Sequence, residues 1–424
     1  MISGIVFALS VLAAADDRLE PHDEVASQVR RLVAELDSPE LARRQAAEEE
    51  LLNLGPKALD FLPGEAGPGK AETAQRLARV RRKLQQAQAS LGLQPSQVSL
   101  EGKMPLAQLL ERLEKQSGNA FATSRLSNRA ELLQREFKVD FRQKPFWPAL
   151  DAILGEAGLE VYPFGEQGRI ELTVSGVPPG AAQRHVAYPG PLRLELVGVQ
   201  AQRDFRSGGG SLKLDIEAAW EPRLAPISLR QPLAEVEAVD DRGRRLAADA
   251  PEATLEIPVP RGPIASRFSV PLALPSRDAS GLREVRGVLW VLAPGPLATF
   301  RFTELGRGSR VAHRMAGGSV TLEGATKLGK TLEVRVLVRF DEPGDALASH
   351  RAWIFNNPAR LETPDGKAIR PESTSPTRQT ANEAGIALLF PIDRAIGDYA
   401  FVYQTPTTIW NVPLEYRFRD VPLP

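Results

Sequence analysis

Apolar residues in the first part of the chain recur at helical spacing. From Val25 to Leu36 they lie three or four positions apart and so line one face of a helix. Ser38-Pro39 then provides a helix start, and Gly55 provides a helix stop. We therefore predict that residues 16–95 form a helical segment.

One pattern then occurs twice in the next part of the chain. Val98–Leu100 has the alternation of a strand, and Pro105–Gly118 reads as a proline, an apolar helix face and a glycine stop. Val139–Phe141 and Pro145–Gly158 repeat this order. The repeat predicts a small α+β domain over 96–175, with both helices packed on one face of a sheet.

This repeat resembles the short N-terminal domain of secretins and of TonB-dependent signal transducers. The residues that carry the resemblance are Val98–Phe121 and Phe137–Val161. The resemblance implies a module that makes protein–protein contacts in the bacterial envelope. No secretin pore pattern follows, so a secretin function is not implied. Residues 23–62, with paired short helices and alanine on the inner face, weakly resemble a HEAT-type helical repeat.

The second half of the chain changes to a period of two. After a linker at 176–191, short alternating runs separated by turns continue to the end, and 332–340 is the clearest of them. We expect two all-β, Ig-like sandwiches, at 192–304 and 305–424. The fold class is thus multidomain: helical segment, α+β domain, two sandwiches.

Composition narrows the chemistry. Lysine plus arginine and aspartate plus glutamate number 53 each, so the formal net charge is zero. This balance argues against a nucleic-acid partner and favours a solvated face for the arginine-rich helix at 70–89. The chain has no cysteine. Thiolate nucleophiles, cysteine-ligated zinc, disulfides and a lipid-bearing cysteine are therefore excluded.

The N-terminal residues have the pattern of an export signal. Residues 1–15 read MISGIVFALSVLAAA, which has the length of a signal-peptide core and ends in small residues at Ala13 and Ala15. We expect cleavage near Ala15 and a periplasmic or extracellular protein. The next longest apolar stretch, 287–300, contains two prolines, so we expect no transmembrane segment in the mature chain.

One sequence motif for nucleotide binding is present. Residues 324–331, GATKLGKT, satisfy the P-loop pattern. A P-loop needs a helix directly after its Lys-Thr pair, whose free N–H groups hold the phosphates. The residues after Thr331 alternate as in a strand, so we predict a loop between two strands and no ATP binding.

The other candidate residues do not form a recognisable site in sequence. We interpret the paired acids as turn residues and Trp353 and Phe355 as strand neighbours that are more often core than sugar platform. The residues weighed are the four histidines His22, His185, His313 and His350, the acid pairs Asp240-Asp241 and Asp341-Glu342, and the loop 341–345 as a calcium option.

We assign no catalytic, cofactor-binding or metal-ligating residue, and no binding residue can be named. The favoured function is an exported, non-catalytic envelope protein that acts as an interaction or scaffold component, with an unidentified envelope protein as partner. An envelope hydrolase with a site at a sandwich loop or domain junction is the alternative, as is a carbohydrate- or surface-binding module. Two or more Asp, Glu, His and Ser side chains in one cleft would favour the hydrolase, and a flat aromatic face would favour sugar binding.

Overall fold

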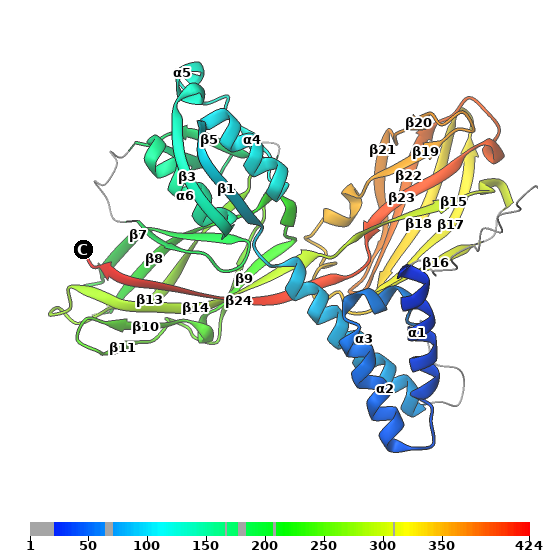
Figure 1. Ribbon diagram of the computed structural model, residues 1–424, viewed down its shortest axis with the longest axis horizontal. Helices are drawn as coiled ribbons and strands as arrows, with labels where there is room; N and C mark the ends of the chain where they lie inside the picture. The colour runs from blue at the N-terminus through cyan, green and yellow to red at the C-terminus, as the bar shows by residue number, and fades with distance from the viewer. Residues whose placement is uncertain (1–20, 64–70, 166–167, 177–183, 207–208, 308–309) are drawn as a thin grey trace, which may run out of the picture. The chain divides into compact units, whose positions relative to one another are not determined.

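The protein divides into two compact units, 1–88 and 89–424. The computed structural model in Figure 1 describes residues 21–63, 71–165, 168–176, 184–206, 209–307 and 310–424. The predicted signal peptide, 1–15, lies outside these residues. The α-helices of the described residues all lie before residue 158 and strands dominate the rest, so the predicted β-rich, multidomain character is confirmed.

The first unit is helical, as predicted. Its elements are α1 (Pro21–Glu35), α2 (Leu41–Asn53), the 3-10 helix η1 (Pro56–Phe61) and α3 (Ala71–Gly92), which continues into the second unit. Ser38 does not cap α2 as expected, because the helix begins later, at Leu41, and the Ser38 hydroxyl accepts the Glu40 N–H instead. The fully buried residues Val29, Leu32, Leu51 and Val80 belong to one apolar core.

The arginine-rich face of α3 is neutralised by acids of the same unit. Arg76 pairs with Glu48 at 3.2 Å and with Glu72 at 3.0 Å, and Arg79 pairs with Glu48 at 3.5 Å. A basic surface for nucleic acid needs uncompensated cations. The sequence predicted a solvated face, whereas Arg76 is largely buried in these pairs and Arg79 is half exposed.

The next module begins the second unit and is the predicted α+β repeat. Its helices α4 (Leu106–Ser117) and α6 (Phe146–Ala157) match the expected helices 105–117 and 145–157, and each ends at a glycine in the left-handed region, Gly118 or Gly158. The remaining elements are β1 (Gln97–Pro105), β2 (Phe121–Ala122), α5 (Arg129–Gln134), β3 (Glu136–Pro145), β4 (Leu159–Tyr162) and β5 (Ile170–Val174).

The prediction of a single sheet in this α+β module is wrong. Strands β1 and β3 pair with each other, whereas β2, β5 and β4 form a separate three-stranded sheet. The helices share one core with both sheets, because α4 and α6 each bury apolar residues that belong to it. Sequence periodicity marks strands but not their partners, which explains the error.

The first sheet module follows, with two sheets around one core. One sheet has the order β13-β8-β7-β6, and the other has the order β11-β10-β14-β9-β12, with β24 paired to β14. The strands are β6 (His185–Ala187), β7 (Leu192–Arg203), β8 (Gly210–Trp220), β9 (Ser228–Pro232), β10 (Glu237–Asp240), β11 (Arg245–Leu246), β12 (Thr254–Ile257), β13 (Ala265–Ala273), β14 (Gly281–Pro294) and β24 (Ile409–Pro422), with the 3-10 helices η2 (Pro222–Leu224) and η3 (Leu233–Glu235).

The second sheet module is inserted between β14 and β24 of the first. Its sheets have the orders β15-β23-β19-β20 and β16-β17-β18-β22-β21 around a second core. Its elements are β15 (Leu297–Phe302), η4 (Leu305–Arg307), β16 (Val311–Met315), β17 (Gly318–Leu328), β18 (Thr331–Phe340), η5 (Trp353–Asn356), β19 (Ala359–Glu362), β20 (Ala368–Ile369), β21 (Ser373–Gln379), β22 (Glu383–Pro391), η6 (Ile396–Asp398) and β23 (Ala400–Pro406).

The inserted arrangement corrects two expected boundaries. Strand β24 pairs with β14 from Pro422 opposite Gly281 to Ile409 opposite Pro294, so the chain's last strand belongs to the first sheet module and not to a domain 305–424 (Figure 1). The expected linker 176–191 contains β6, which pairs with β7. The β14–β24 pairing is long-range, and a local pattern does not encode it.

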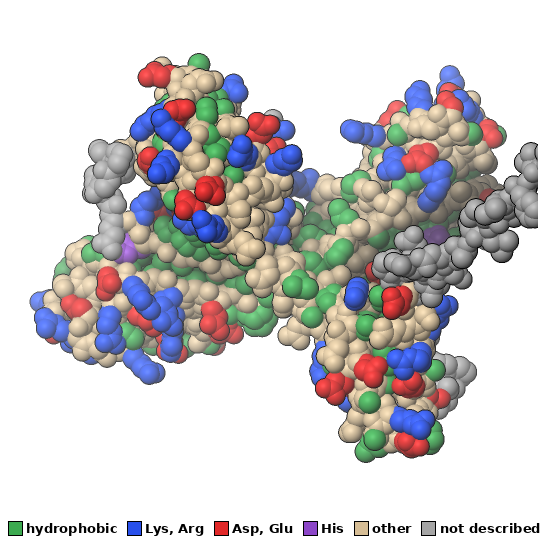
Figure 2. All heavy atoms as spheres, viewed as in Figure 1, with side chains coloured by type: hydrophobic (Ala, Val, Ile, Leu, Met, Phe, Trp, Pro, Cys, Tyr) green, Lys and Arg blue, Asp and Glu red, His purple; other side chains and the backbone are tan. Residues whose placement is uncertain are grey.

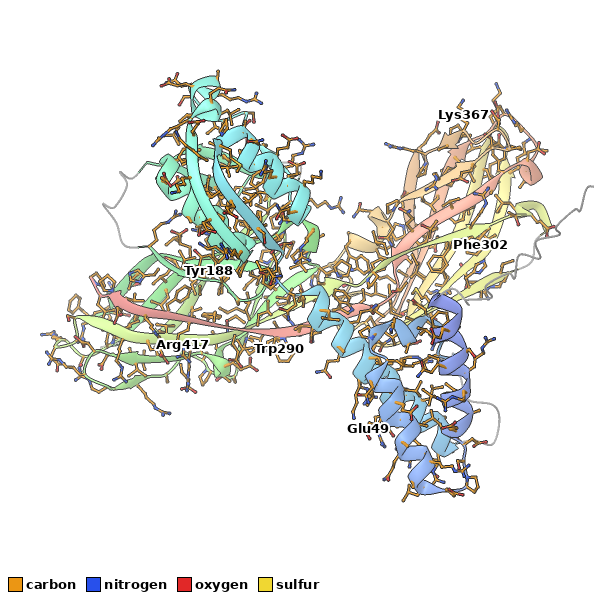
Figure 3. The ribbon with its side chains drawn as sticks, in the orientation of Figure 1. Glu49, Tyr188, Trp290, Phe302, Lys367 and Arg417 are labelled. Atoms are coloured by element: carbon orange, nitrogen blue, oxygen red, sulfur yellow. The ribbon has the colours of Figure 1, made fainter. Side chains whose placement is uncertain are left out.

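The α+β module and the first sheet module share buried contacts. The Trp147 indole N–H donates to the Pro191 carbonyl at 3.0 Å, and Ala219 and Ile264 of the sheet module join the α+β core. Tyr188, labelled in Figure 3, donates from its hydroxyl to the Asp151 carboxylate on α6 at 2.7 Å. These contacts fix the two modules to each other within the second unit.

Candidate binding cleft

The second unit contains a cavity of about 850 Å³, which we call the proline cleft. Its walls come from the end of β8, from η2, from the start of β9, from β12 and the loop after it, and from η5 with the residues before it. The apolar lining comprises Trp220, Pro222, Ala225, Pro226, Ile227, Ile257, Pro258, Val259, Pro260, Pro263, Ile264, Ala352 and Trp353, and the polar lining includes Ser228, Glu256, His350, Arg351 and Asn356.

Prolines make the cleft wall rigid. The loop 258–263 reads PVPRGP and joins β12 to the segment before β13. Each proline fixes its φ and removes one backbone N–H, so this loop has few conformations to lose when a ligand binds. The cleft is therefore a largely preformed surface, which is the usual state of a binding site.

Arg351 carries the charge at one end of the cleft. Its Nη2 donates to the Asp345 carboxylate at 2.7 Å and lies 3.7 Å from Glu256, while its Nε contacts His350 Nε2 at 3.3 Å. The Arg351 side chain is only 6% exposed. Glu256 and His350, by contrast, stand at the solvent side of the cleft, with the His350 Nε2 3.6 Å from the Glu256 carboxylate.

Three buried polar atoms around the cleft have no hydrogen-bond partner in the described residues. They are the Ser228 hydroxyl oxygen, one carboxylate oxygen of Asp345 and the Nη1 of Arg351. A buried polar group without a partner costs about 1–3 kcal/mol, so such groups are rare and call for a reason. Ser228 and Arg351 line the cleft, and Asp345 pairs with Arg351, so these side chains are where we look for contact with a ligand.

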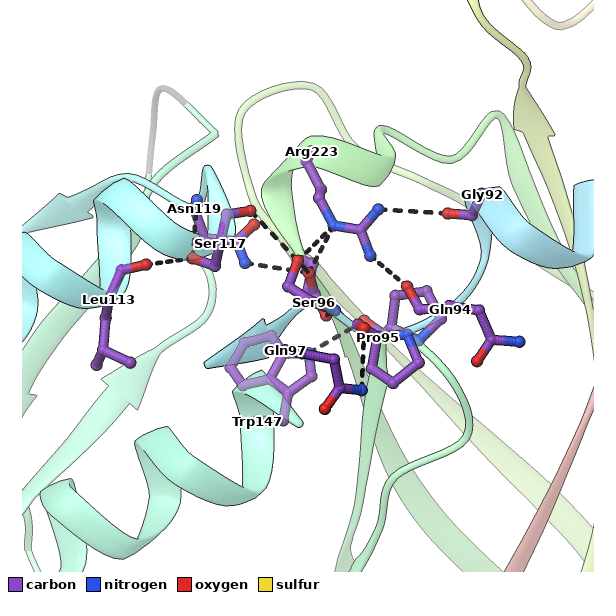
Figure 4. A network of polar contacts seen from close by, with 12 residues as sticks. Gly92, Gln94, Pro95, Ser96, Gln97, Leu113, Ser117, Asn119, Trp147 and Arg223 are labelled. Atoms are coloured by element: carbon purple, nitrogen blue, oxygen red, sulfur yellow. Dashed lines mark hydrogen bonds and ion pairs between the residues drawn. The ribbon is translucent and has the colours of Figure 1, made fainter. Parts of the chain in front are cut away.

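A buried hydrogen-bond network stabilises the part of the cleft wall that Trp220 and Pro222 form. Glu221 lies between two lining residues, Trp220 and Pro222, and is itself fully buried. Its carboxylate accepts from three residues labelled in Figure 4, namely Ser96, Asn119 and Arg223. Because the donors come from the start of the α+β module, from the end of α4 and from η2, the network ties one cleft wall to the neighbouring module.

The P-loop-like motif is a strand hairpin, as predicted. Strands β17 and β18 pair down to Leu328 opposite Thr331, and Gly329 takes the turn with φ +64. A strand follows Lys330, so no helix N-terminus is present to receive a phosphate.

The paired acids have structural partners. The Asp240 carboxylate, 1% exposed, accepts the backbone N–H groups of Arg242 and Arg244, and Asp241 accepts from Ser280. Asp341 pairs with Arg314 at 2.7 Å. The contacts of Asp240 with Arg242 and Arg244 fit the interpretation of the first pair as turn residues. The described residues include no group of three or more His, Asp or Glu side chains placed to hold a metal ion.

The histidines with described side chains lie at separate places in the structure. His185 Nδ1 contacts the Arg419 carbonyl at 3.1 Å, and the His313 ring packs on Phe302 with centroids 4.8 Å apart. Of the three histidines with described side chains, only His350 lines the proline cleft. The side chain of His22 lies outside the described part of the chain.

Trp353 lines the cleft, and the prediction that it lies in a strand is wrong. Trp353 and Phe355 belong to the 3-10 helix η5 and not to a strand, because the chain turns here, with the Phe355 N–H donating to the Ala352 carbonyl. The Trp353 indole N–H donates to the Ala346 carbonyl at 2.7 Å. Sequence analysis missed the cleft, although the proline-rich run 258–263 was a visible signal of a rigid surface.

Comparison with known proteins finds no family model and no curated protein that matches this chain. Among the described helices, none is both long and apolar enough to cross a membrane. Figure 2 shows cationic and anionic side chains interspersed on the face that it presents, in keeping with the zero net charge.

Proposed function

We propose that this chain is an exported, non-catalytic protein of the bacterial envelope that holds a partner in the proline cleft and acts as a scaffold component. The observation that carries this proposal is a preformed cavity lined by two side chains with unpartnered buried polar atoms, Ser228 and Arg351, the second of which pairs with Asp345. A rigid, mainly apolar cavity with a few convergent polar groups is the usual form of a binding site.

The modular construction supports a scaffold. The chain joins a helical module, an α+β module and two sheet modules, which we propose are Ig-like. The repeated strand and proline-led helix of the α+β module support its resemblance to the short N-terminal domain of secretins and signal transducers. By that resemblance, the α+β module makes protein contacts of its own in the envelope.

Export is part of the proposal and has its own test. The apolar run at 1–15 and the Ala13-x-Ala15 site support cleavage near Ala15. N-terminal sequencing of protein from the native host is expected to begin near Asp16. Protein that retains Met1 in a cytoplasmic fraction would contradict this part.

Affinity capture from envelope extracts tests the cleft as the binding site. Ala352 lines the cleft and is exposed, so Ala352→Trp places a large ring in the cleft from a position outside the core. Ala312→Trp, on the exposed face of β16, is the matched control. We expect one or more proteins to be captured by wild type and the control but lost from Ala352→Trp. Identical capture by all three proteins would show that the cleft is not the site.

A hydrolase is the second candidate, because Ser228, Glu256 and His350 all line one cleft. In a nucleophile–base–acid arrangement, the acid and the nucleophile contact different ring nitrogens of the histidine. Here the Glu256 carboxylate and the Arg351 guanidinium both face Nε2. The geometry therefore supports binding better than hydrolysis. Covalent labelling of Ser228 by a fluorophosphonate probe would reverse this preference.

A further inference from the structure

We propose that the partner in the proline cleft is an extended peptide segment that adds as a further strand along the free edge of β12. This inference rests on the proposed function and names the chemical class of its ligand. It joins three observations: an edge strand at the cleft, the phase of its hydrogen bonds and the kind of polar atoms left without partners.

Strand β12 is the last strand of its sheet. In the order β11-β10-β14-β9-β12 it pairs, among the described strands, with β9 alone, from Thr254 opposite Pro232 to Ile257 opposite Leu229. A sheet edge presents backbone N–H and C=O groups that pair readily with another extended chain. Because Glu256 also lines the proline cleft, the edge and the cavity adjoin.

The ladder between β12 and β9 shows which backbone groups face outward. Just beyond the end of the ladder the Leu233 N–H donates to the Ala253 carbonyl at 2.9 Å, so Ala253 directs its carbonyl toward this neighbouring chain. Hydrogen-bonded and non-hydrogen-bonded pairs alternate along an antiparallel ladder. Thr254 and Glu256 therefore point their backbone groups away from β9. Proline at position 232 agrees with this phase, because it has no N–H to offer Thr254.

The unpartnered atoms suit a peptide better than an anion. Arg351 Nη1 needs an acceptor, whereas the free oxygen of Asp345 needs a donor, and the two side chains are joined at 2.7 Å. A peptide group offers a C=O and an N–H side by side and can satisfy both. A carboxylate or a phosphate would satisfy Arg351 but would be repelled by Asp345 and Glu256.

The walls supply room for the peptide's side chains. Ile227, Val259 and Trp353 offer apolar surface beside the edge. In strand addition the main-chain bonds give affinity, and pockets for alternate side chains give specificity. A glycan would instead need flat aromatic stacking surfaces, and Trp353 is the one half-buried aromatic ring among the lining residues named above.

The test uses the full-length protein and a phage-displayed library of random peptides about ten residues long. The binding affinity of the selected peptides is then measured for two variants at position 256. Glu256→Pro removes the outward N–H and is tolerated at an edge, whereas Glu256→Ala keeps the N–H and removes only the side chain. We expect Glu256→Pro to weaken binding about tenfold relative to Glu256→Ala. Matching urea midpoints show that both variants are folded.

N-methylation of the selected peptide gives an independent readout. Strand addition predicts that methyl groups on every second backbone nitrogen abolish binding, whereas those between are tolerated. Equal affinity of Glu256→Pro and Glu256→Ala, or uniform tolerance of N-methylation, would overturn the inference. So would a failure to enrich any peptide on wild type over Ala352→Trp. Extract capture that is still lost in Ala352→Trp would then leave the proposed function standing with a ligand other than an extended peptide.

Discussion

The Asn119 side-chain amide donates to the carboxylate of Glu221 at 3.1 Å, although 102 positions separate the two residues in the chain. Both side chains are fully buried. The same carboxylate accepts from the Ser96 hydroxyl at 2.5 Å and from the Arg223 Nε at 2.7 Å. A buried charge is stable only where hydrogen-bond donors surround it. The hydrogen bonds to this carboxylate therefore connect the α+β module to the first sheet module.

Loss of this carboxylate is expected to be costly. Glu221→Ala leaves Asn119 and Arg223 without their buried acceptor, and removing one partner of a buried pair costs about 3–5 kcal/mol. Arg223 is partly solvated, so we expect the lower end of that range. Urea unfolding of the full-length protein measures it. Glu101→Ala, at an exposed position of β1, is the control, and an equal midpoint for the two variants would contradict the role given to Glu221.

The helix α6 carries much of the α+β core. Leu150 is fully buried, so Leu150→Ala should lower the free energy of unfolding by about 2–5 kcal/mol, through lost transfer energy and the cavity that remains. Leu91→Ala removes a side chain that is 64% exposed and serves as the control. Urea midpoints that do not separate these variants would contradict the packing described for α6.

Local sequence patterns were sufficient to predict the helices α4 and α6. A proline before the helix, an apolar stripe and a left-handed glycine after it are all encoded within one short segment. The insertion of the second sheet module was not predictable in this way. It depends on β14 pairing with β24, and a local alternation says nothing of its partner.

The proline cleft was not predictable from the sequence for the same reason, because its residues come together only in the fold. Glu256 and Arg351 contribute to one charged cluster from two sheet modules, far apart in sequence. Each residue alone has an ordinary sequence context. Only the proline run 258–263 could have marked the region before the fold was known.

The β14–β24 ladder has a position that only glycine fits. A Cβ on Gly287 would lie 2.5 Å from the Tyr416 hydroxyl, and that buried ring is held by its bond to Gln231 at 3.0 Å. Gly287→Ala should therefore destabilise the protein by about 1–3 kcal/mol. Gly324→Ala, in β17, meets no atom within 4 Å and should change stability by less than about 1 kcal/mol. Thermal unfolding of both variants compares them, and equal melting temperatures would contradict the packing of Tyr416 on β14.

Acid is expected to weaken the first sheet module through Asp278. Its hydrogen bond with Ser276, together with that from Arg244, lowers the pKa of Asp278 from 3.8 to about 2. A lowered folded-state pKa means that the contribution is complete above pH 3.8 and is lost as pH falls toward about 2.

Asp278→Asn should therefore have a lower melting temperature than wild type near neutral pH. This difference in melting temperature should become smaller as the pH approaches about 2. The exposed Asp249 of the same module provides the control Asp249→Asn. A difference between Asp278→Asn and wild type that stays constant over this pH range would contradict the assigned ion pair with Arg244.

Photo-crosslinking in the native host tests the central claim, that the proline cleft holds a partner, most directly. The photoreactive amino acid p-benzoylphenylalanine is placed at Ala352 in the cleft or at the exposed control position Ala312 on β16. We predict a discrete, light-dependent adduct with an envelope protein from position 352 and none from position 312. Adducts of the same protein from both positions, or from neither, would contradict the proline cleft as the binding site.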